Sequence, residues 1–172
     1  MIRLVTLDPF EEELVHKLTR IIYQAYGLGC EFAGEVKTPD EAKTGSELDA
    51  ALLLKHGEDV VSYADDKVVY LTSHKFAGRE LPSGKAPTPG LAEYGKARAV
   101  VSSHGLPQGD ALLKRLGKQA VHDIGHLWEL HHCLDPRCAM YPPWTPTFLT
   151  GEPVLCTFCR DKSEKKIRLA KT

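Results

Sequence analysis

Side chains that bind metal ions crowd into one short part of this chain. Four of its 8 histidines and four of its 5 cysteines lie between residues 122 and 159. They are His122, His126, His131, His132, Cys133, Cys138, Cys156 and Cys159. In a reducing compartment, such a cluster indicates metal binding before disulfide bonds. The sequence therefore predicts a metal-rich C-terminal third.

The remaining composition is that of an ordinary soluble globular domain. The chain has 172 residues, of which 42% are hydrophobic and 26% charged. At this length roughly 70% of the unfolded surface can be buried, so the core needs no disulfide framework. The net charge is -1, and there is neither a basic stripe nor a run of about 20 apolar residues, so we expect no nucleic-acid partner and no membrane span. Residues 1–7 lack the features of an export signal, and we expect a cytoplasmic monomer.

The N-terminal half alternates strand patterns with helix patterns. Its elements are a strand over 2–7, a helix from Asp8 to Gly27, a strand over 30–36, a helix from Ser46 to Gly57 and a strand over 67–72. In the first helix, Asp8 has the residue type of an N-cap and Pro9 that of the first helical position. The order βαβαβ predicts a layered α/β domain.

The second half begins with an irregular segment and then forms the longest helix. Residues 73–90 hold three prolines and three glycines with little periodicity, which predicts an exposed loop. Residues 91–103 have strand character, with a bulge expected at Gly95. From Asp110 to Leu127 the apolar residues recur with the period of a helix.

Two histidines on this helix are placed to share one metal ion. His122 and His126 are four residues apart, so their imidazoles project from one face, about 40° apart around the axis. His132 would point roughly 80° away from His122 on a continued helix, so the chain must turn near residue 129 to bring it round. Three neutral imidazoles with one open coordination position are the arrangement of zinc sites that hydrolyse substrates.

A pair of histidines on a helix, taken alone, is as often a surface or core feature as a metal site. The cysteines strengthen the interpretation as a metal site. Their spacing is Cys133-x4-Cys138, then 17 residues, then Cys156-x2-Cys159. Two thiolate pairs of this kind close a tetrahedral Zn²⁺ site, the alternatives being free thiols or a disulfide. A structural zinc would tie together the irregular segment 133–160, which has few hydrophobic residues of its own.

The run from His122 to Cys133, followed by Cys138-Ala139-Met140, closely resembles the archaemetzincins, whose pattern is HExxHxxGxxHCxxxxCxM followed by CxxC. The resemblance implies a catalytic zinc on His122, His126 and His132, and Met140 in the Met-turn beneath it. It also implies a structural zinc, and hence two Zn²⁺ per chain, the second held by Cys133, Cys138, Cys156 and Cys159.

The resemblance implies a fold as well, and covers residues 1–165. It is a metzincin-like α/β fold with a mixed twisted sheet, helices and an active-site helix. Residues 1–132 form the N-terminal α/β subdomain that includes this helix, and residues 133–172 form a small C-terminal subdomain tied by zinc. Metzincins are similar to one another in pairing an extended substrate with an edge strand, so residues 91–103 and His104 are expected to border the cleft.

Two residues depart from the family pattern. Asp123 stands where the family has the glutamate that activates water as general base. A displacement of about 1 Å can lower a rate on the order of 10²-fold, and a positioned base is worth about 10²–10⁴-fold, so we expect weakened hydrolysis. Glu129 stands where the family has a glycine, and a left-handed non-glycine residue costs roughly 1–2 kcal/mol. Alternatively, the helix continues and Glu129 itself ligates or caps the ion, or His131 is the third ligand.

The function expected from these residues is zinc-dependent hydrolysis of a peptide or protein substrate. In this hypothesis Asp123 orients the attacking water toward a peptide carbonyl. One alternative is a catalytically inactive, zinc-stabilised peptide-binding protein, which both departures favour. A third interpretation is a zinc-ribbon interaction module in which the histidines are incidental, and the net charge and third histidine speak against it.

Overall fold

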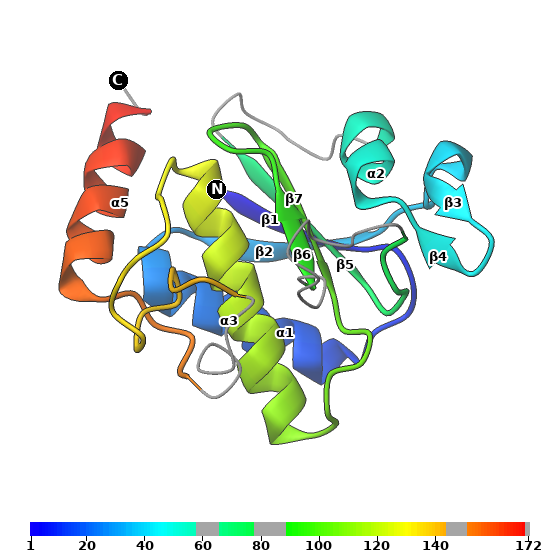
Figure 1. The fold of residues 1–172 in the computed structure, drawn as a ribbon, viewed down its shortest axis with the longest axis horizontal. Coiled ribbons are helices and arrows are strands. Elements are labelled where there is room, and N and C mark those ends of the chain that lie inside the picture. Colours follow the sequence, from blue (N-terminus) through cyan, green and yellow to red (C-terminus); the bar gives the residue numbers. More distant parts are fainter. Residues whose placement is uncertain (58–65, 78–88, 144–150, 171–172) are drawn as a thin grey trace.

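A five-stranded mixed sheet forms the centre of the molecule in a computed structural model that describes residues 1–57, 66–77, 89–143 and 151–170 (Figure 1). The strand order is β2-β1-β5-β7-β6, in which the first four strands are parallel and β6 is antiparallel to β7. The strands are β1 (Ile2–Thr6), β2 (Cys30–Glu35), β5 (Lys67–Thr72), β6 (Gly90–Ala92) and β7 (Arg98–Ser102). The predicted α/β fold with a mixed sheet is confirmed.

Helices cover both faces of the sheet. The larger apolar cluster holds α1 and α3 against one face and includes residues of α5, whereas the smaller cluster holds α2 against the other. Side chains of β5 alternate between the clusters, with Val69 and Leu71 in the first and Val68 and Tyr70 in the second, as the period of a strand requires. The remaining elements are α1 (Glu12–Tyr26), a 3-10 helix η1 (Asp40–Ala42), β3 (Lys43–Thr44), β4 (Glu47–Leu48), α2 (Ala50–His56), α3 (Asp110–Leu127) and α5 (Thr157–Leu169).

The predicted start of the first helix is wrong. Helix α1 begins at Glu12 rather than beside Asp8, because the Asp8 carboxylate has a partner elsewhere. It accepts hydrogen bonds from the Thr72 hydroxyl at 2.7 Å and from the backbone N–H of Ser73 at 3.0 Å. This contact fixes residue 8 to the end of β5. The predicted helix end at Gly27 is confirmed, with φ of 62°.

The second helix also begins later than predicted. Asp49 rather than Ser46 is its N-cap, with Oδ1 accepting from the N–H groups of Ala51 and Leu52 at 2.9 Å. Residues 43–48, which precede the cap, form the short antiparallel pair of β3 and β4.

The single strand predicted over 91–103 is a hairpin. Strands β6 and β7 pair antiparallel around a turn, where Gly95 has φ of 68° instead of forming a bulge. Glu93 N–H donates to the Arg98 carbonyl at 3.0 Å and closes the turn. Strand β6 thereby becomes the edge of the sheet, beside α3. Of the predicted 73–90 loop, residues 78–88 lie outside the described residues.

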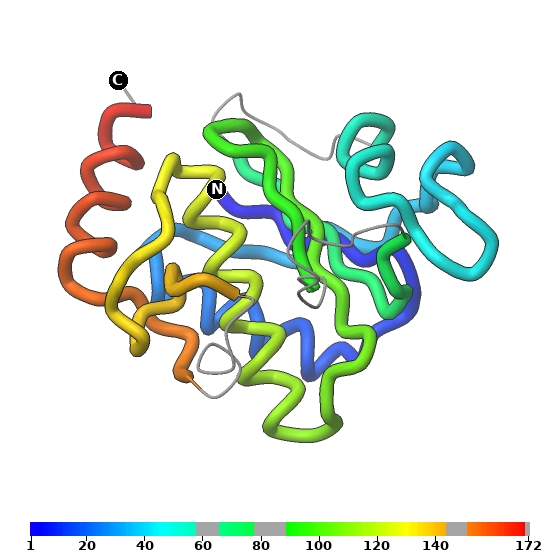
Figure 2. Tube along the Cα trace, in the orientation of Figure 1, coloured from blue at the N-terminus to red at the C-terminus, as the bar shows by residue number. Residues whose placement is uncertain are grey.

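The C-terminal segment returns to the same core. Figure 2 shows the chain leaving α3, passing through residues 128–143 and ending in α5. Met140 and Ile167 belong to the cluster that contains α1 and α3. The division into subdomains at residue 133 stays a prediction.

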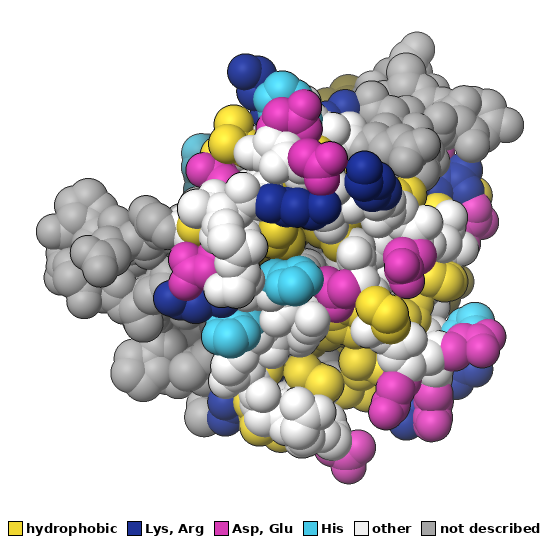
Figure 3. Space-filling model, turned by 90° about the vertical axis from the view of Figure 1, so that its right-hand side faces the viewer, with side chains coloured by type: hydrophobic (Ala, Val, Ile, Leu, Met, Phe, Trp, Pro, Cys, Tyr) yellow, Lys and Arg dark blue, Asp and Glu magenta, His cyan; other side chains and the backbone are white. Residues whose placement is uncertain are grey.

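The described surface carries charges of both signs, and on the face drawn in Figure 3 the acidic and basic side chains are interspersed. Among the helices in the described ranges, none is long and apolar enough to cross a membrane.

Candidate metal centre

The long helix α3 carries two histidines whose ring nitrogens meet. The Nε2 atoms of His122 and His126 lie 3.0 Å apart, and the rings are nearly perpendicular, at 86°. His122 is 1% exposed and His126 is half-buried. The two imidazoles therefore converge on one point at the edge of the core.

The opposite nitrogen of each ring is held by a backbone carbonyl. His122 Nδ1 lies 2.8 Å from the Ala139 carbonyl, and His126 Nδ1 lies 2.8 Å from the Leu130 carbonyl. A carbonyl only accepts, so each Nδ1 carries the donated proton and each Nε2 keeps its lone pair in the neutral ring. Metal-binding histidines are commonly oriented by such bonds.

The third histidine reaches this pair because the chain reverses after the helix. Helix α3 ends at Leu127, and Glu129 has φ of 58°, so both the predicted turn near residue 129 and its left-handed residue are confirmed. The His132 ring stacks on that of His122, with centroids 5.2 Å apart. One ligand atom from each of His122, His126 and His132 lies within 4.8 Å of the others, so the group could hold a metal ion.

Burial favours the neutral form of the two helix imidazoles, and the third, His132, is an exposed residue. Desolvation, helped by nearby His126, lowers the pKa of His122 to about 3. Desolvation is also the main cause that lowers the pKa of His126 and of His132. A metal ligand must be unprotonated, so the rings are in the required state at neutral pH.

The two alternative ligands lie outside the histidine group. Glu129 does not return to the face of His122, because the helix has ended; its carboxylate pairs with Lys166 of α5. His131 stacks on Tyr94, with centroids 5.2 Å apart, and its Nε2 lies 3.0 Å from the Tyr94 hydroxyl. The hypothesis of Glu129 as a ligand on a continued helix is therefore wrong.

Asp123 lies buried between α3 and the edge strand. It is 3% exposed, and its Oδ2 accepts a hydrogen bond from Gln119 Nε2 at 2.8 Å. On the other side it lies against Gly90, where a Cβ would overlap Oδ2. The sequence predicts neither neighbour. Gln119 is four residues earlier on the same helix, a spacing that could have indicated it, whereas Gly90 has no local signal.

Met140 supports the helix directly below the histidines. Its side chain is fully buried and packs so closely on Gly125 that a Cβ at residue 125 would overlap Sδ. The Met140 carbonyl accepts from the Cys133 N–H at 2.8 Å. This contact links the turn that carries Met140 to the start of the cysteine segment. Next to it, the Tyr141 N–H donates to the Cys138 carbonyl at 3.0 Å.

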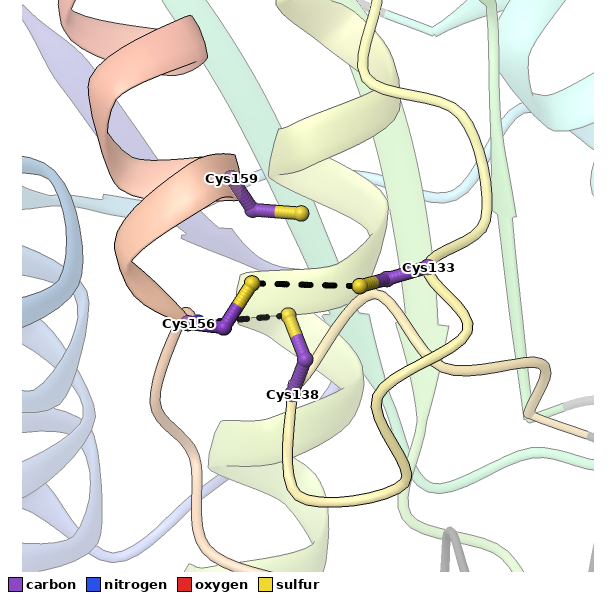
Figure 4. A group of neighbouring side chains, drawn as sticks. All are labelled: Cys133, Cys138, Cys156 and Cys159. Atoms are coloured by element: carbon purple, nitrogen blue, oxygen red, sulfur yellow. Dashed lines mark hydrogen bonds between the residues drawn. The ribbon is translucent and has the colours of Figure 1, made fainter.

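The four clustered cysteines form a second group that could hold a metal ion. Figure 4 shows their sulfur atoms facing a common centre, two from the loop after α3 and two from the start of α5. One Sγ from each of Cys133, Cys138, Cys156 and Cys159 lies within 4.8 Å of the others. The Sγ atoms of Cys133 and Cys156 are 3.8 Å apart, well beyond a disulfide bond. Four sulfur donors in this arrangement suit tetrahedral zinc.

Hydrogen bonds prepare one of these sulfurs as a thiolate. The Cys159 thiol and the N–H groups of Cys156 and Met140, the last two at 3.3 and 3.4 Å, lower the pKa of Cys138 to about 5. The fifth cysteine behaves differently, because burial raises the pKa of Cys30 to about 12. Cys30 packs beside the larger apolar cluster as an ordinary core residue.

Comparison with curated proteins finds archaemetzincins, although no protein-family model matches the chain. The chain is 40% identical to an archaemetzincin of Archaeoglobus fulgidus over 78 residues, or 44% of this chain and 47% of the relative. Identity to the Pyrococcus furiosus archaemetzincin is 35% over 60 residues, which span 31% of that relative. The Methanocaldococcus jannaschii archaemetzincin matches over more of its length, with 29% identity over 150 residues and 80% of the relative. The first two matches thus span less than half of the relatives' length.

Solved structures match along nearly the whole chain. The archaemetzincin of Methanopyrus kandleri has a TM-score of 0.77 at 23% identity and covers 97% of this chain and 94% of its own. A zinc-dependent peptidase of Methanocorpusculum labreanum has a TM-score of 0.78 at 22% identity and covers 95% of this chain and 100% of its own. These likenesses establish the fold, and the sequence matches carry the same name. The chain is therefore similar to archaemetzincins in parts of its sequence and in its fold.

Proposed function

We propose that this protein is a zinc-dependent metallopeptidase in which His122, His126 and His132 hold the catalytic zinc. The observation that carries the proposal is the arrangement of the two histidines on α3, His122 and His126. Their Nε2 atoms face one point, while carbonyls hold their Nδ1 atoms in the orientation and tautomer that a metal ligand requires. The name of the Methanocorpusculum labreanum neighbour, a zinc-dependent peptidase, supports the same chemistry.

The three histidines provide neutral nitrogen ligands, a donor set that fits zinc. Zinc bound by three imidazoles acidifies water and polarises a carbonyl. Asp123 follows His122 directly and carries the carboxylate that would accept the proton of the attacking water. Its hydrogen bond from Gln119 and its contact with Gly90 hold this carboxylate between helix and sheet.

A peptide substrate would bind along strand β6, the last strand in the order of the sheet. An extended peptide can add to such an edge through main-chain hydrogen bonds. Because Gly90 at the start of β6 lies against Asp123, a peptide on this edge would pass close to the base. This position accords with the expected role of residues 91–103.

We further propose two zinc ions per chain, the second held by the four cysteines. That site would be structural, because four sulfur ligands leave no open coordination position. It would tie the loop after α3 to the start of α5, and Cys133 is the direct neighbour of His132 in the sequence. The cytoplasmic location, the monomeric state and the lack of a nucleic-acid partner stay predictions.

The test is peptide hydrolysis by the zinc-loaded protein, with His126→Ala and Asp123→Asn as variants. Peptides of a library should be cleaved, and mass spectrometry should identify the new termini. A hydroxamate should inhibit this cleavage. His126→Ala should abolish turnover, and Asp123→Asn should lower the rate by about 10²–10⁴-fold, the usual contribution of a positioned base. Peptide binding without cleavage by wild type and by Asp123→Glu would favour the inactive peptide-binding alternative.

A further inference from the structure

The turn between the second and third histidines is a helix C-cap with an unusual residue at its key position. The Leu130 N–H donates to the Gly125 carbonyl at 2.9 Å, and the Glu129 N–H donates to the His126 carbonyl at 3.0 Å. These two bonds define a Schellman motif, whose left-handed residue is usually glycine. Here that residue is Glu129, with φ of 58°, and among the described residues no other non-glycine has a positive φ.

This turn orients two of the three histidines. Its last residue, Leu130, supplies the carbonyl that holds His126 Nδ1 at 2.8 Å, and His132 follows two residues later. An opening of the turn would therefore move both the orienting bond of His126 and the ring of His132. The left-handed conformation at residue 129 has to be held by something other than a glycine.

Two neighbouring elements, the β6–β7 hairpin and α5, bind the turn from different sides. At the tip of the β6–β7 hairpin, the Tyr94 hydroxyl donates to the Glu129 carbonyl at 2.9 Å, and the Gly95 N–H donates to the His126 carbonyl at 2.9 Å. From the other side, Lys166 of α5 forms an ion pair with the Glu129 carboxylate. Since the one Tyr94 proton goes to Glu129, His131 Nε2 must donate to the Tyr94 oxygen, 3.0 Å away.

We propose that Tyr94 and Lys166 are positioning residues for the metal-binding histidines, because they clamp Glu129 in the left-handed conformation that a glycine would adopt unaided. The inference rests on the proposed metal site at His122, His126 and His132. Tyr94 and Lys166 need not touch the ion. They act on the turn at residue 129: Tyr94 binds the backbone carbonyl of Glu129, and Lys166 binds its carboxylate.

The test is Co²⁺ affinity at the histidine site, measured on protein that keeps zinc at the cysteines. Imidazole-bound cobalt gives weak d–d bands, which differ from the intense sulfur-to-cobalt charge transfer of a thiolate site. Tyr94→Phe and Lys166→Met should each weaken this affinity by about 10-fold, the lower end of the loss seen for residues that orient ligands. Tyr23→Phe and Lys165→Met are matched controls on exposed helix positions and should bind like wild type.

A Glu129→Gly background separates the clamp from a general loss of structure. Glycine holds the turn without help, so Glu129→Gly should bind Co²⁺ like wild type, and adding Tyr94→Phe should change the affinity by less than about 2-fold. Equal affinity of Tyr94→Phe, Lys166→Met and wild type would overturn the clamp. So would an undiminished effect of Tyr94→Phe in the glycine background. If wild type itself bound no Co²⁺ at the histidines, the proposed function would fail as well.

Discussion

The carboxylate of Asp123 and the backbone of Gly90 are in direct contact, so the active-site helix and the edge strand meet at the proposed base. A Cβ at residue 90 would overlap Asp123 Oδ2 and would lie 2.6 Å from Gln119 Nε2. The strand can lie this close to the helix only because residue 90 has no side chain. The contact ties the position of the proposed base to the position of the proposed substrate-binding edge.

Gly90→Ala should therefore lower peptide hydrolysis by about 10² or more, because displacement of a catalytic group by about 1 Å is enough for such a loss. Zinc content should stay at two ions per chain, because the atoms nearest to the added Cβ belong to Asp123 and Gln119 and not to a proposed zinc ligand. Gly29→Ala is the control, because its Cβ would meet Met1 Sδ at an ordinary 3.4 Å. Full activity of Gly90→Ala would mean that Asp123 needs no fixed position.

Gly125→Ala should lower stability although alanine favours helices. The added methyl would overlap Met140 Sδ and lie 3.1 Å from the Tyr26 hydroxyl. Overpacking of this kind costs about 1–3 kcal/mol, against about 1 kcal/mol gained in helix propensity. We expect urea unfolding to show a net loss of about 1 kcal/mol. In the same helix, Gly117→Ala would bring its Cβ no closer than 3.0 Å to Ile21 Cδ1 and 3.3 Å to Ile21 Cγ2, and it should cost less.

Cys138→Ser should remove one zinc ion and leave the other. The Cys138 sulfur accepts two backbone N–H groups at the centre of the cysteine group, so its loss removes the best prepared thiolate. Elemental analysis should return about two zinc ions for wild type and about one for Cys138→Ser and for His126→Ala. Cys30→Ala should keep both, since Cys30 lies outside the group. One zinc in wild type would contradict the proposed count.

The metal-free protein should lose stability on acidification because of His122. Burial lowers the folded-state pKa of His122 to about 3 from a usual value of 6.5, so the unfolded chain binds the proton first. Stability that is present above pH 6.5 is therefore lost as the pH falls toward 3, by up to about 1.4 kcal/mol per pH unit. Urea unfolding with a chelator should show a steeper fall between pH 6.5 and 4 for wild type than for His122→Asn. Equal slopes would mean that His122 is not buried as a neutral ring.

Local signals predict the parts of the fold that depend on nearby residues. Three features lie where the sequence predicts them: the strand over residues 67–72, the helix Asp110–Leu127 and the end of α1 at Gly27. Apolar periodicity and a glycine C-cap act within a few residues, so the local sequence is enough to predict them. The four-residue spacing of His122 and His126 likewise predicts their shared face. Glu129 is left-handed at the position where the archaemetzincin pattern has glycine, whereas the sequence leaves open a continued helix there.

The errors arise where a distant residue decides the outcome. Asp8 resembles an N-cap, yet its carboxylate binds Thr72, the last residue of β5, and Ser73, which follows it. Gly95 marks a hairpin turn rather than a bulge, and its N–H donates to the carbonyl of His126 on another element. Gly90 lies against Asp123 of α3, and Tyr94 binds the Glu129 carbonyl in the turn after α3, although both belong to the hairpin. No pattern within 91–103 reveals that Leu91 pairs with Val100 and Ala92 with Ala99.

The most direct test of this account is anomalous diffraction at the zinc edge from crystals of the zinc-loaded protein. We predict two peaks per chain, one about 2.0–2.1 Å from the Nε2 atoms of His122 and His126 and from a ring nitrogen of His132, and one about 2.3 Å from all four sulfur atoms. The absence of a peak among the three imidazoles, in protein that holds zinc at the cysteines, would contradict the proposed catalytic site.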